Sequence, residues 1–224
     1  MLKDKRLRFI IGHYGSGKTE FSINYAVKLA EIGKKVALAD LDVVNLYFRS
    51  REKRELLEKL GVKVIASSID ASAVDIPAIS AEIVTPMQDT SYEGVIDVGG
   101  DPAGARTLGR YNEYFVEGKY DMFFVLNANR PETQTVDKAI EYLRKIEDTA
   151  RARVTGIVNN THMLKSTTVE DVLKGQSLAK KVSERTNIPI KYISVIEDVA
   201  KELPDDLEGE IFPMTLYMRE DWMI

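Results

Sequence analysis

The chain has 224 residues, 44% of them hydrophobic, and its 31 basic and 35 acidic residues give a formal net charge of −4. This length suits a single α/β domain over residues 1–224, and the acidic balance argues against general nucleic-acid binding. The absence of cysteine excludes disulfides and thiolate metal sites, and no apolar run approaches the about 20 residues of a membrane span. With no signal peptide visible, we expect a cytoplasmic protein that has no membrane partner.

Short apolar runs recur along the whole chain. They are Phe9–Ile11, Val36–Ala39, Val62–Ile65, Val95–Val98, Met122–Leu126, Val154–Val158 and Ile190–Val195. Each run is continuous rather than alternating, which is typical of strands that are buried on both faces of a parallel sheet.

Helical patterns separate most of these runs. The clearest extend from Thr19 to Ile32, which stops at Gly33, and from Thr133 to Ala150. A third, from Thr167 to Arg185, is interrupted by Gly175, and a short helix is expected around Ile76–Ile83. The alternation predicts a doubly wound, three-layer α/β fold with a mostly parallel sheet of about seven strands.

The first run leads into Gly12-His13-Tyr14-Gly15-Ser16-Gly17-Lys18-Thr19, which has the G-x-x-x-x-G-K-T spacing of a phosphate-binding loop between a strand and a helix. Its glycines let backbone N–H groups point at phosphate oxygens. Lys18 is expected at the β- and γ-phosphates and the Thr19 hydroxyl at Mg²⁺. The expected nucleotide contacts here are Gly12, His13, Gly15, Ser16, Gly17, Lys18, Thr19 and Glu20.

Carboxylates follow two other strands. Asp97 ends the fourth run and stands three residues before Gly100, the D-x-x-G spacing of a loop that senses the γ-phosphate. Asp40 and Asp42, two residues apart on an extended segment, point to the same side. We expect Thr19, Asp40, Asp42 and Asp97 around the metal, and Lys18, Asp42 and Asp97 in catalysis. Turn or helix capping is the alternative role for each aspartate.

These motifs, with Asn45-Leu46, Pro102-Ala103-Gly104 and Val158-Asn159, resemble the ParA/MinD-like P-loop ATPases of the SIMIBI class, which contain the CobQ/CobB/MinD/ParA nucleotide-binding domain. The resemblance implies ATP and Mg²⁺ as cofactors, a protein partner and a homodimer as candidate assembly. It also implies that an asparagine reads adenine, Asn159 in preference to Asn160. His13 stands where the family has its signature lysine, and serves either as a phosphate contact or as a spacer. His162 is assigned no role.

Three functions remain open. The first is a slow ATPase that acts as a switch or assembly factor for a partner protein. The second is an ATP-dependent small-molecule kinase or ligase, which would need cations such as Arg49, Arg51, Arg106 or Arg110 for an anionic substrate. The third is a GTPase. Proteins that read guanine usually carry an N-K-x-D motif after a late strand, and here the corresponding residues are Asn159-Asn160-Thr161-His162, without the aspartate, which favours adenine.

Overall fold

The computed structural model describes residues 1–41, 53–66, 81–100 and 102–218. Asp42, Asn45, Arg49 and Arg51 lie outside the described residues, as does most of the helix expected around 76–83.

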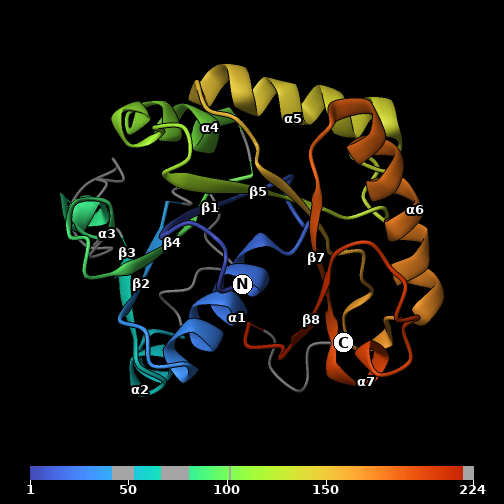
Figure 1. Cartoon of the computed structure of the whole chain (residues 1–224), viewed down its shortest axis with the longest axis horizontal. Coiled ribbons are helices and arrows are strands. Elements are labelled where there is room, and N and C mark those ends of the chain that lie inside the picture. Colours follow the sequence, from blue (N-terminus) through green and yellow to red (C-terminus); the bar gives the residue numbers. More distant parts are fainter. Residues whose placement is uncertain (42–52, 67–80, 101, 219–224) are drawn as a thin grey trace, which may run out of the picture.

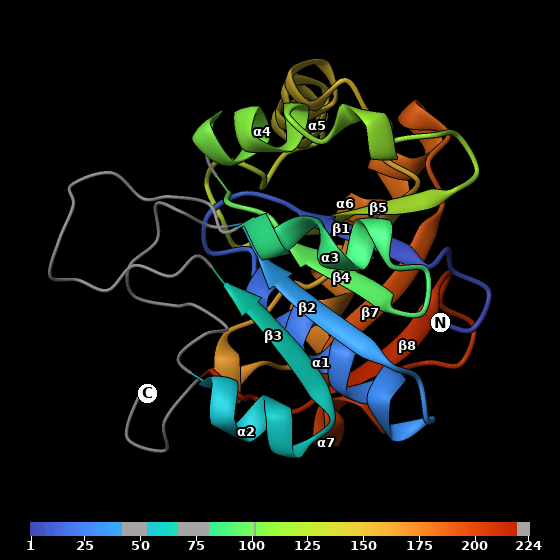
Figure 2. The same cartoon turned by 90° about the vertical axis from the view of Figure 1, so that its left-hand side faces the viewer.

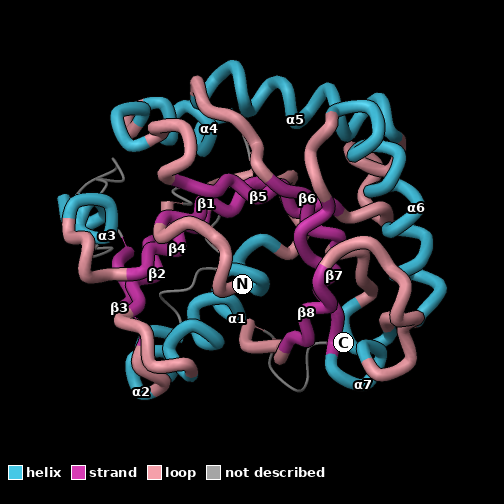
Figure 3. The backbone as a smooth tube through the Cα atoms, in the orientation of Figure 1, coloured by secondary structure: helices cyan, strands magenta, loops and turns pink. Residues whose placement is uncertain are grey.

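One parallel sheet runs through the described chain (Figures 1 and 3). Its strands are β1 (Leu7–Ile11), β2 (Val36–Asp40), β3 (Val62–Ala66), β4 (Glu93–Asp97), β5 (Tyr120–Leu126), β6 (Gly156–Asn159), β7 (Ile190–Ile196) and β8 (Glu210–Met214). They pair in the order β3-β2-β4-β1-β5-β6-β7-β8. The sheet therefore has eight strands rather than about seven. Sequence analysis missed β8 because Pro213 lies inside it, and a proline weakens any prediction of a strand.

Helices cover both faces of the sheet, which confirms the three-layer, doubly wound fold (Figure 2). They are α1 (Lys18–Glu31), α2 (Arg54–Lys59), α3 (Thr85–Gln88), α4 (Pro102–Gly109), α5 (Val136–Ala150), α6 (Val169–Thr186) and α7 (Glu197–Ala200). Short 3₁₀ turns add η2 (Ala81–Val84), η3 (Asn112–Tyr114) and η4 (Leu164–Ser166). None of the described helices is both long and apolar enough to cross a membrane.

Successive strand residues face opposite layers of the core. Phe9 and Ile11 of β1 pack with α4, α5 and α6, whereas Ile10 between them packs with α1 and α2. All three side chains are at most 1% exposed. Burial on both faces explains why the strands appear in the sequence as unbroken apolar runs.

The structure shifts two helix boundaries for local reasons. Helix α5 begins at Val136 rather than Thr133, because the Thr135 side chain caps it by accepting a hydrogen bond from Lys138 N. Helix α6 continues through Gly175, where a Cβ atom would lie 2.1 Å from Thr161 Oγ1. This glycine lets the helix approach the end of β6 and does not interrupt the helix.

Strand β1 lies between the two halves of the sheet: β2, β3 and β4 are on one side of it, and β5 to β8 are on the other. Its neighbours are β4 on one side and β5 on the other, so that residues after β1 lie at the switch point between the two halves. Ligands of open α/β sheets bind at the carboxyl edge of the strands at such a point. The predicted phosphate loop is located there.

Candidate functional site

The loop between β1 and α1 has a backbone that only glycine accommodates at key positions. Gly15 and Gly17 have φ values of 75° and 86°. A Cβ atom on Gly12 would lie 2.5 Å from the Val125 carbonyl oxygen, and one on Gly17 would lie 2.2 Å from Asn160 Nδ2. The glycines that the motif requires thus allow the loop to curl and also to pack against the ends of β5 and β6.

Two hydroxyl groups of α1 donate hydrogen bonds to one carboxylate beside the loop. Thr19 Oγ1 donates a 2.7 Å hydrogen bond to Asp97 Oδ2, and Ser22 Oγ donates to the other carboxylate oxygen at 3.3 Å. Asp97 ends β4, is 1% exposed, and pairs in register with Asp40 of β2, which is also buried. The structure brings together Thr19 and Asp97 and places Asp40 on the adjacent strand. This set of oxygen donors suits Mg²⁺, a hard cation that is commonly held by one or two carboxylates together with phosphates.

The turn after β4 lies directly against the phosphate loop. A Cβ atom on Gly100 would lie 2.6 Å from Lys18 Nζ and 2.7 Å from Tyr14 N. The Gly100 carbonyl accepts a 2.9 Å hydrogen bond from the Tyr142 hydroxyl of α5, and the same hydroxyl is 3.4 Å from the Gly12 carbonyl oxygen. A displacement of Gly100 therefore changes contacts with the loop and with α5 together.

His13 lies on the outer side of the loop, near α5. Its Nδ1 is 3.0 Å from the Tyr14 carbonyl oxygen and 3.9 Å from a carboxylate oxygen of Glu132. Its ring packs edge-on against Tyr142, with centroids 5.2 Å apart. The structure thus gives His13 protein neighbours and does not place it among the residues that line the pocket described next.

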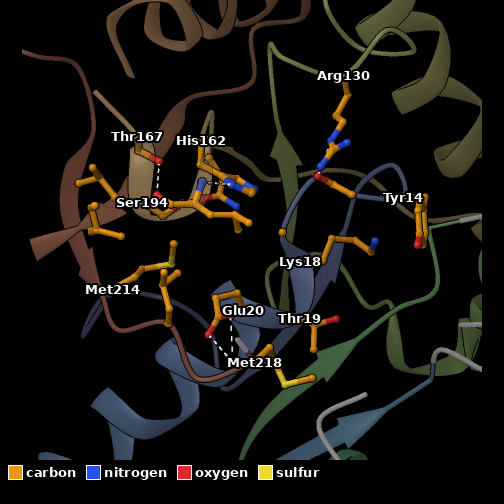
Figure 4. A pocket seen from close by; sticks show the side chains of 17 residues that line it. Tyr14, Lys18, Thr19, Glu20, Arg130, His162, Thr167, Ser194, Met214 and Met218 are labelled. Carbon is orange, nitrogen blue, oxygen red and sulfur yellow. Dashed lines mark hydrogen bonds between the residues drawn. The ribbon is translucent and has the colours of Figure 1, made fainter. Parts of the chain in front are cut away.

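A pocket of about 270 Å³ extends from the phosphate loop toward β7 and β8 (Figure 4). Its phosphate half, at one end, is lined by Tyr14, Gly15, Gly17, Lys18, Thr19 and Arg130. The other end, which we name the base half because a nucleotide with its phosphates at the loop would extend there, is lined by Glu20, Asn160, His162, Leu164, Thr167, Ser194, Val195, Ile196, Met214, Leu216 and Met218. A polar end beside a largely apolar end suits a ligand that has a charged head and a flat apolar body.

Arg130 is a lining residue that sequence reasoning missed. It follows β5, and its Nε donates a 2.8 Å hydrogen bond to the Gly15 carbonyl oxygen. Gly15 also gives it room, since a Cβ atom there would lie 2.8 Å from the guanidinium carbon. No motif marks Arg130, and the only available signal is its place just after a strand at the carboxyl edge of the sheet.

The two asparagines after β6 face different neighbours. Asn160 Nδ2 donates a 2.7 Å hydrogen bond to the Ser16 carbonyl oxygen, and Asn160 Oδ1 accepts one of 2.9 Å from Ser194 Oγ. Asn159 Nδ2 instead donates to the Val172 carbonyl oxygen of α6 at 3.0 Å. Asn160 lines the pocket and Asn159 is buried against α6. Of the two, Asn160 is therefore the one placed to contact a ligand in the pocket, and its role at the base stays a prediction.

The structure also shows which of the remaining candidate residues line the pocket. The Glu20 carboxylate lines the pocket but accepts hydrogen bonds from the backbone N–H groups of Tyr217 and Met218, at 2.5 and 3.1 Å. His162, which sequence analysis left without a role, lines the pocket. Arg106 and Arg110 are exposed on and just after α4 and do not line it.

A central parallel strand, a glycine-rich loop, a helix and an adjacent Thr–Asp pair define a P-loop nucleotide-binding protein. The family model described as the CobQ/CobB/MinD/ParA nucleotide-binding domain matches residues 10–198, and the chain belongs to this family. This match confirms the resemblance that the motifs indicated. A comparison with curated proteins gives no match.

Solved structures with the same fold include signal-recognition-particle receptors. FtsY from Mycoplasma mycoides is 21% identical, with a TM-score of 0.58 over 92% of this chain and 64% of that one. FtsY from Elizabethkingia anophelis, in complex with GDP, is 18% identical, with a TM-score of 0.54 over 86% and 58%. A nucleotide-binding protein from Archaeoglobus fulgidus, in complex with ADP, is 18% identical, with a TM-score of 0.50 over 89% and 86%. The chain spans less than two thirds of the FtsY chains, and these likenesses show the fold.

Proposed function

We propose that the protein is a nucleotide-dependent switch that binds Mg·ATP, hydrolyses it slowly and in its ATP form binds a protein partner. The observation that carries this proposal is the position of Gly100 between Lys18 of the phosphate loop and Tyr142 of α5. A γ-phosphate beside Lys18 would meet the turn that holds Gly100. Its loss on hydrolysis would release that turn and, through Tyr142, alter the packing of α5.

Magnesium fits the same proposal. Thr19 and Asp97 supply the oxygens that would hold it, with Asp40 next to them and Asp42 outside the described residues. The metal would supply neutralisation of the negative charge on the phosphates. Asp97 is held in place by Thr19 and Ser22, so its carboxylate is already oriented before any ligand binds. We propose that Asp42 orients the attacking water.

Adenine is favoured over guanine by the chemistry of the base half. A guanine site commonly uses a carboxylate that accepts hydrogen bonds from two donors of the base. Among the described residues that line the pocket, Glu20 is the one acidic side chain, and its carboxylate accepts hydrogen bonds from Tyr217 and Met218. We therefore infer ATP as the ligand, and GTP is the competitor to measure beside it.

A small-molecule kinase or ligase is the alternative activity. It needs a cationic acceptor site near the phosphates. Arg106 and Arg110 are exposed and do not line the pocket, whereas Arg130 does line it and donates to the Gly15 carbonyl oxygen; Arg49 and Arg51 lie outside the described residues. A pull-down from native extract with an ATP analogue and with ADP, beside a screen for turnover stimulated by metabolites, distinguishes the two functions. Identical partner profiles, together with rapid turnover triggered by one metabolite, would reject the switch. Light scattering in the same two nucleotide states tests the homodimer.

The site itself is tested by Asp97→Asn, which keeps the size of the side chain and removes its charge. We expect the variant to fold and to lose about tenfold or more of kcat for phosphate release, because the metal and the attacking water lose a carboxylate. Asp121→Asn is the matched control: Asp121 is also buried and hydrogen-bonded but lies near the start of β5. A wild-type kcat in Asp97→Asn would reject the catalytic role and favour a purely structural one.

A further inference from the structure

The segment that follows β8 forms one wall of the pocket. What we call the C-terminal strap, residues Met214–Met218, separates two pockets. Met214, Leu216 and Met218 line the nucleotide pocket. Thr215 and Tyr217, together with Met214, line a second pocket, of about 290 Å³, beside α1. The strap is thus an extended partition that has one apolar side toward the candidate nucleotide site.

Two side chains of α1 hold the strap by its backbone. Asn24 Nδ2 donates to the Thr215 carbonyl oxygen and Asn24 Oδ1 accepts from Thr215 N, both at 2.8 Å. Glu20 accepts from the backbone N–H group of Tyr217 and from that of Met218, of which Figure 4 shows the second. Hydrogen bonds to a carboxylate are stronger than neutral ones, so Glu20 is expected to be the firmer of the two anchors.

The position of Glu20 connects this wall to the phosphate loop. It immediately follows Thr19 on the first turn of α1, the helix that begins at Lys18. The same turn therefore presents groups for phosphate and metal on one side and fixes the strap on another. The matched family region ends at residue 198, so the strap lies beyond the part of the chain that defines the family.

The side chains of the strap suit a flat aromatic ligand. Met218 and Met214 are both 7% exposed, and thioether side chains are flexible enough to fit closely against an aromatic ring. In Figure 4, Met214 lies across from Ser194, whereas Met218 lies beside Glu20 and toward Thr19. The strap carries no cationic side chain for phosphate, since its residues are Met214, Thr215, Leu216, Tyr217 and Met218.

We propose that the C-terminal strap is the wall against which the nucleotide base packs, and that Glu20 is the positioning residue that keeps this wall in place. The inference rests on the proposed nucleotide binding and deepens it by assigning base recognition to residues outside the family region. Glu20 then acts on the base through the strap, without contributing to the binding of the phosphates.

The test compares a ligand that has a base with one that lacks it. Calorimetry measures the Kd of Mg·ATP and of Mg·tripolyphosphate for the unmodified chain, Glu20→Gln and Glu20→Ala. We expect Glu20→Ala to bind ATP about tenfold or more weakly and to bind tripolyphosphate as before. Glu20→Gln, which keeps one acceptor oxygen, is expected to lie between. Glu31→Ala is the matched control, because Glu31 lies near the end of the same helix and lines the second pocket.

The outcomes separate the inference from the proposed function. Equal weakening of both ligands by Glu20→Ala would place Glu20 at the phosphates and overturn the inference, as would unchanged ATP affinity. Failure of the unmodified chain to bind either ligand would overturn the proposed function and the inference with it. Leu216→Ser tests the wall directly, with Glu20 intact. Its thermal unfolding reports whether it folds, and a folded variant with normal ATP affinity would also contradict the inference.

Discussion

The phosphate half and the base half of the pocket are built in opposite ways. The phosphate half is built around a loop of contiguous residues at fixed spacing, with Lys18 and Thr19 at its end and one side chain, Arg130, added from after β5. The base half is mostly side chains that come from the ends of β6, β7 and β8 and from the C-terminal strap. In one of these contacts the Met218 N–H group donates to the Glu20 carboxylate, although the two residues are 198 positions apart in the sequence.

This difference indicates which part of the pocket can change its ligand specificity through single substitutions. A backbone loop binds phosphate through N–H groups that every residue has, so its sequence is restricted mainly by conformation. A side-chain wall can be altered one residue at a time without disturbing that loop. The two halves meet at Asn160, which donates a hydrogen bond to the Ser16 carbonyl oxygen of the loop.

The largest effect is expected from Lys18→Ala. Removing the ammonium group leaves the phosphates without their nearest cation, so we expect Mg·ATP and Mg·tripolyphosphate both to bind about 100-fold more weakly. Calorimetry measures this, and Lys28→Ala, near the end of the same helix, is the control. If only ATP binding falls, the division of the pocket into two halves is wrong.

An intermediate effect is expected where the two halves meet. Asn160→Ala removes the contacts with Ser16 and Ser194, so we expect ATP to bind about tenfold more weakly. Asn159→Ala removes a buried hydrogen bond to α6 and is expected to lower the melting temperature more than the affinity. Calorimetry and thermal unfolding of both variants measure the contrast. The reverse pattern would return base recognition to Asn159.

The smallest effect is expected at the opposite edge of the sheet. The Asp4 side chain is buried there, and burial alone would raise its pKa. Hydrogen bonds from Tyr192 and Tyr25, with the charges of the amino terminus and Lys191, outweigh burial and lower the pKa below the usual value. A lowered pKa means that Asp4 stabilises the fold above about pH 4 and that this stability is lost as the pH falls through the folded-state pKa.

Urea unfolding of the unmodified chain and Asp4→Asn at pH 5 and at pH 3 measures this contribution. We expect the unmodified chain to lose more unfolding free energy between the two pH values than the variant does. ATP affinity at neutral pH is expected to be equal in both, because Asp4 lies away from the pocket. An identical pH dependence would show that the pKa of Asp4 is not lowered in the folded state.

The sequence predicted the fold well because buried parallel strands and phosphate loops have local signatures. Continuous apolar runs located seven strands, and the spacing from Gly12 to Thr19 located the loop. The pairing of Thr19 with Asp97 was also foreseeable, since both follow strands that end at one edge of the sheet. The metal and nucleotide roles of these residues remain predictions that the variants above test.

The base half could not be predicted because its signals are not local. Pro213 obscured β8, and nothing in the sequence of the strap indicates that Asn24 and Glu20 of α1 hold its backbone. The choice between Asn159 and Asn160 depends on which way the end of β6 turns, and Gly175 on α6 decides this by admitting the side chain of Asn159. Such contacts exist only once the fold has formed.

The attachment of Met218 to Glu20 has a consequence for biosynthesis. Contacts of such long sequence separation close late, because the chain between them must first be ordered. On the ribosome, the phosphate loop emerges early, while the strap emerges nearly 200 residues later. With the proposed base site, a nascent chain would complete that site only after residue 218 has left the exit tunnel, and nucleotide present in the cell would then favour the conformation with the strap docked.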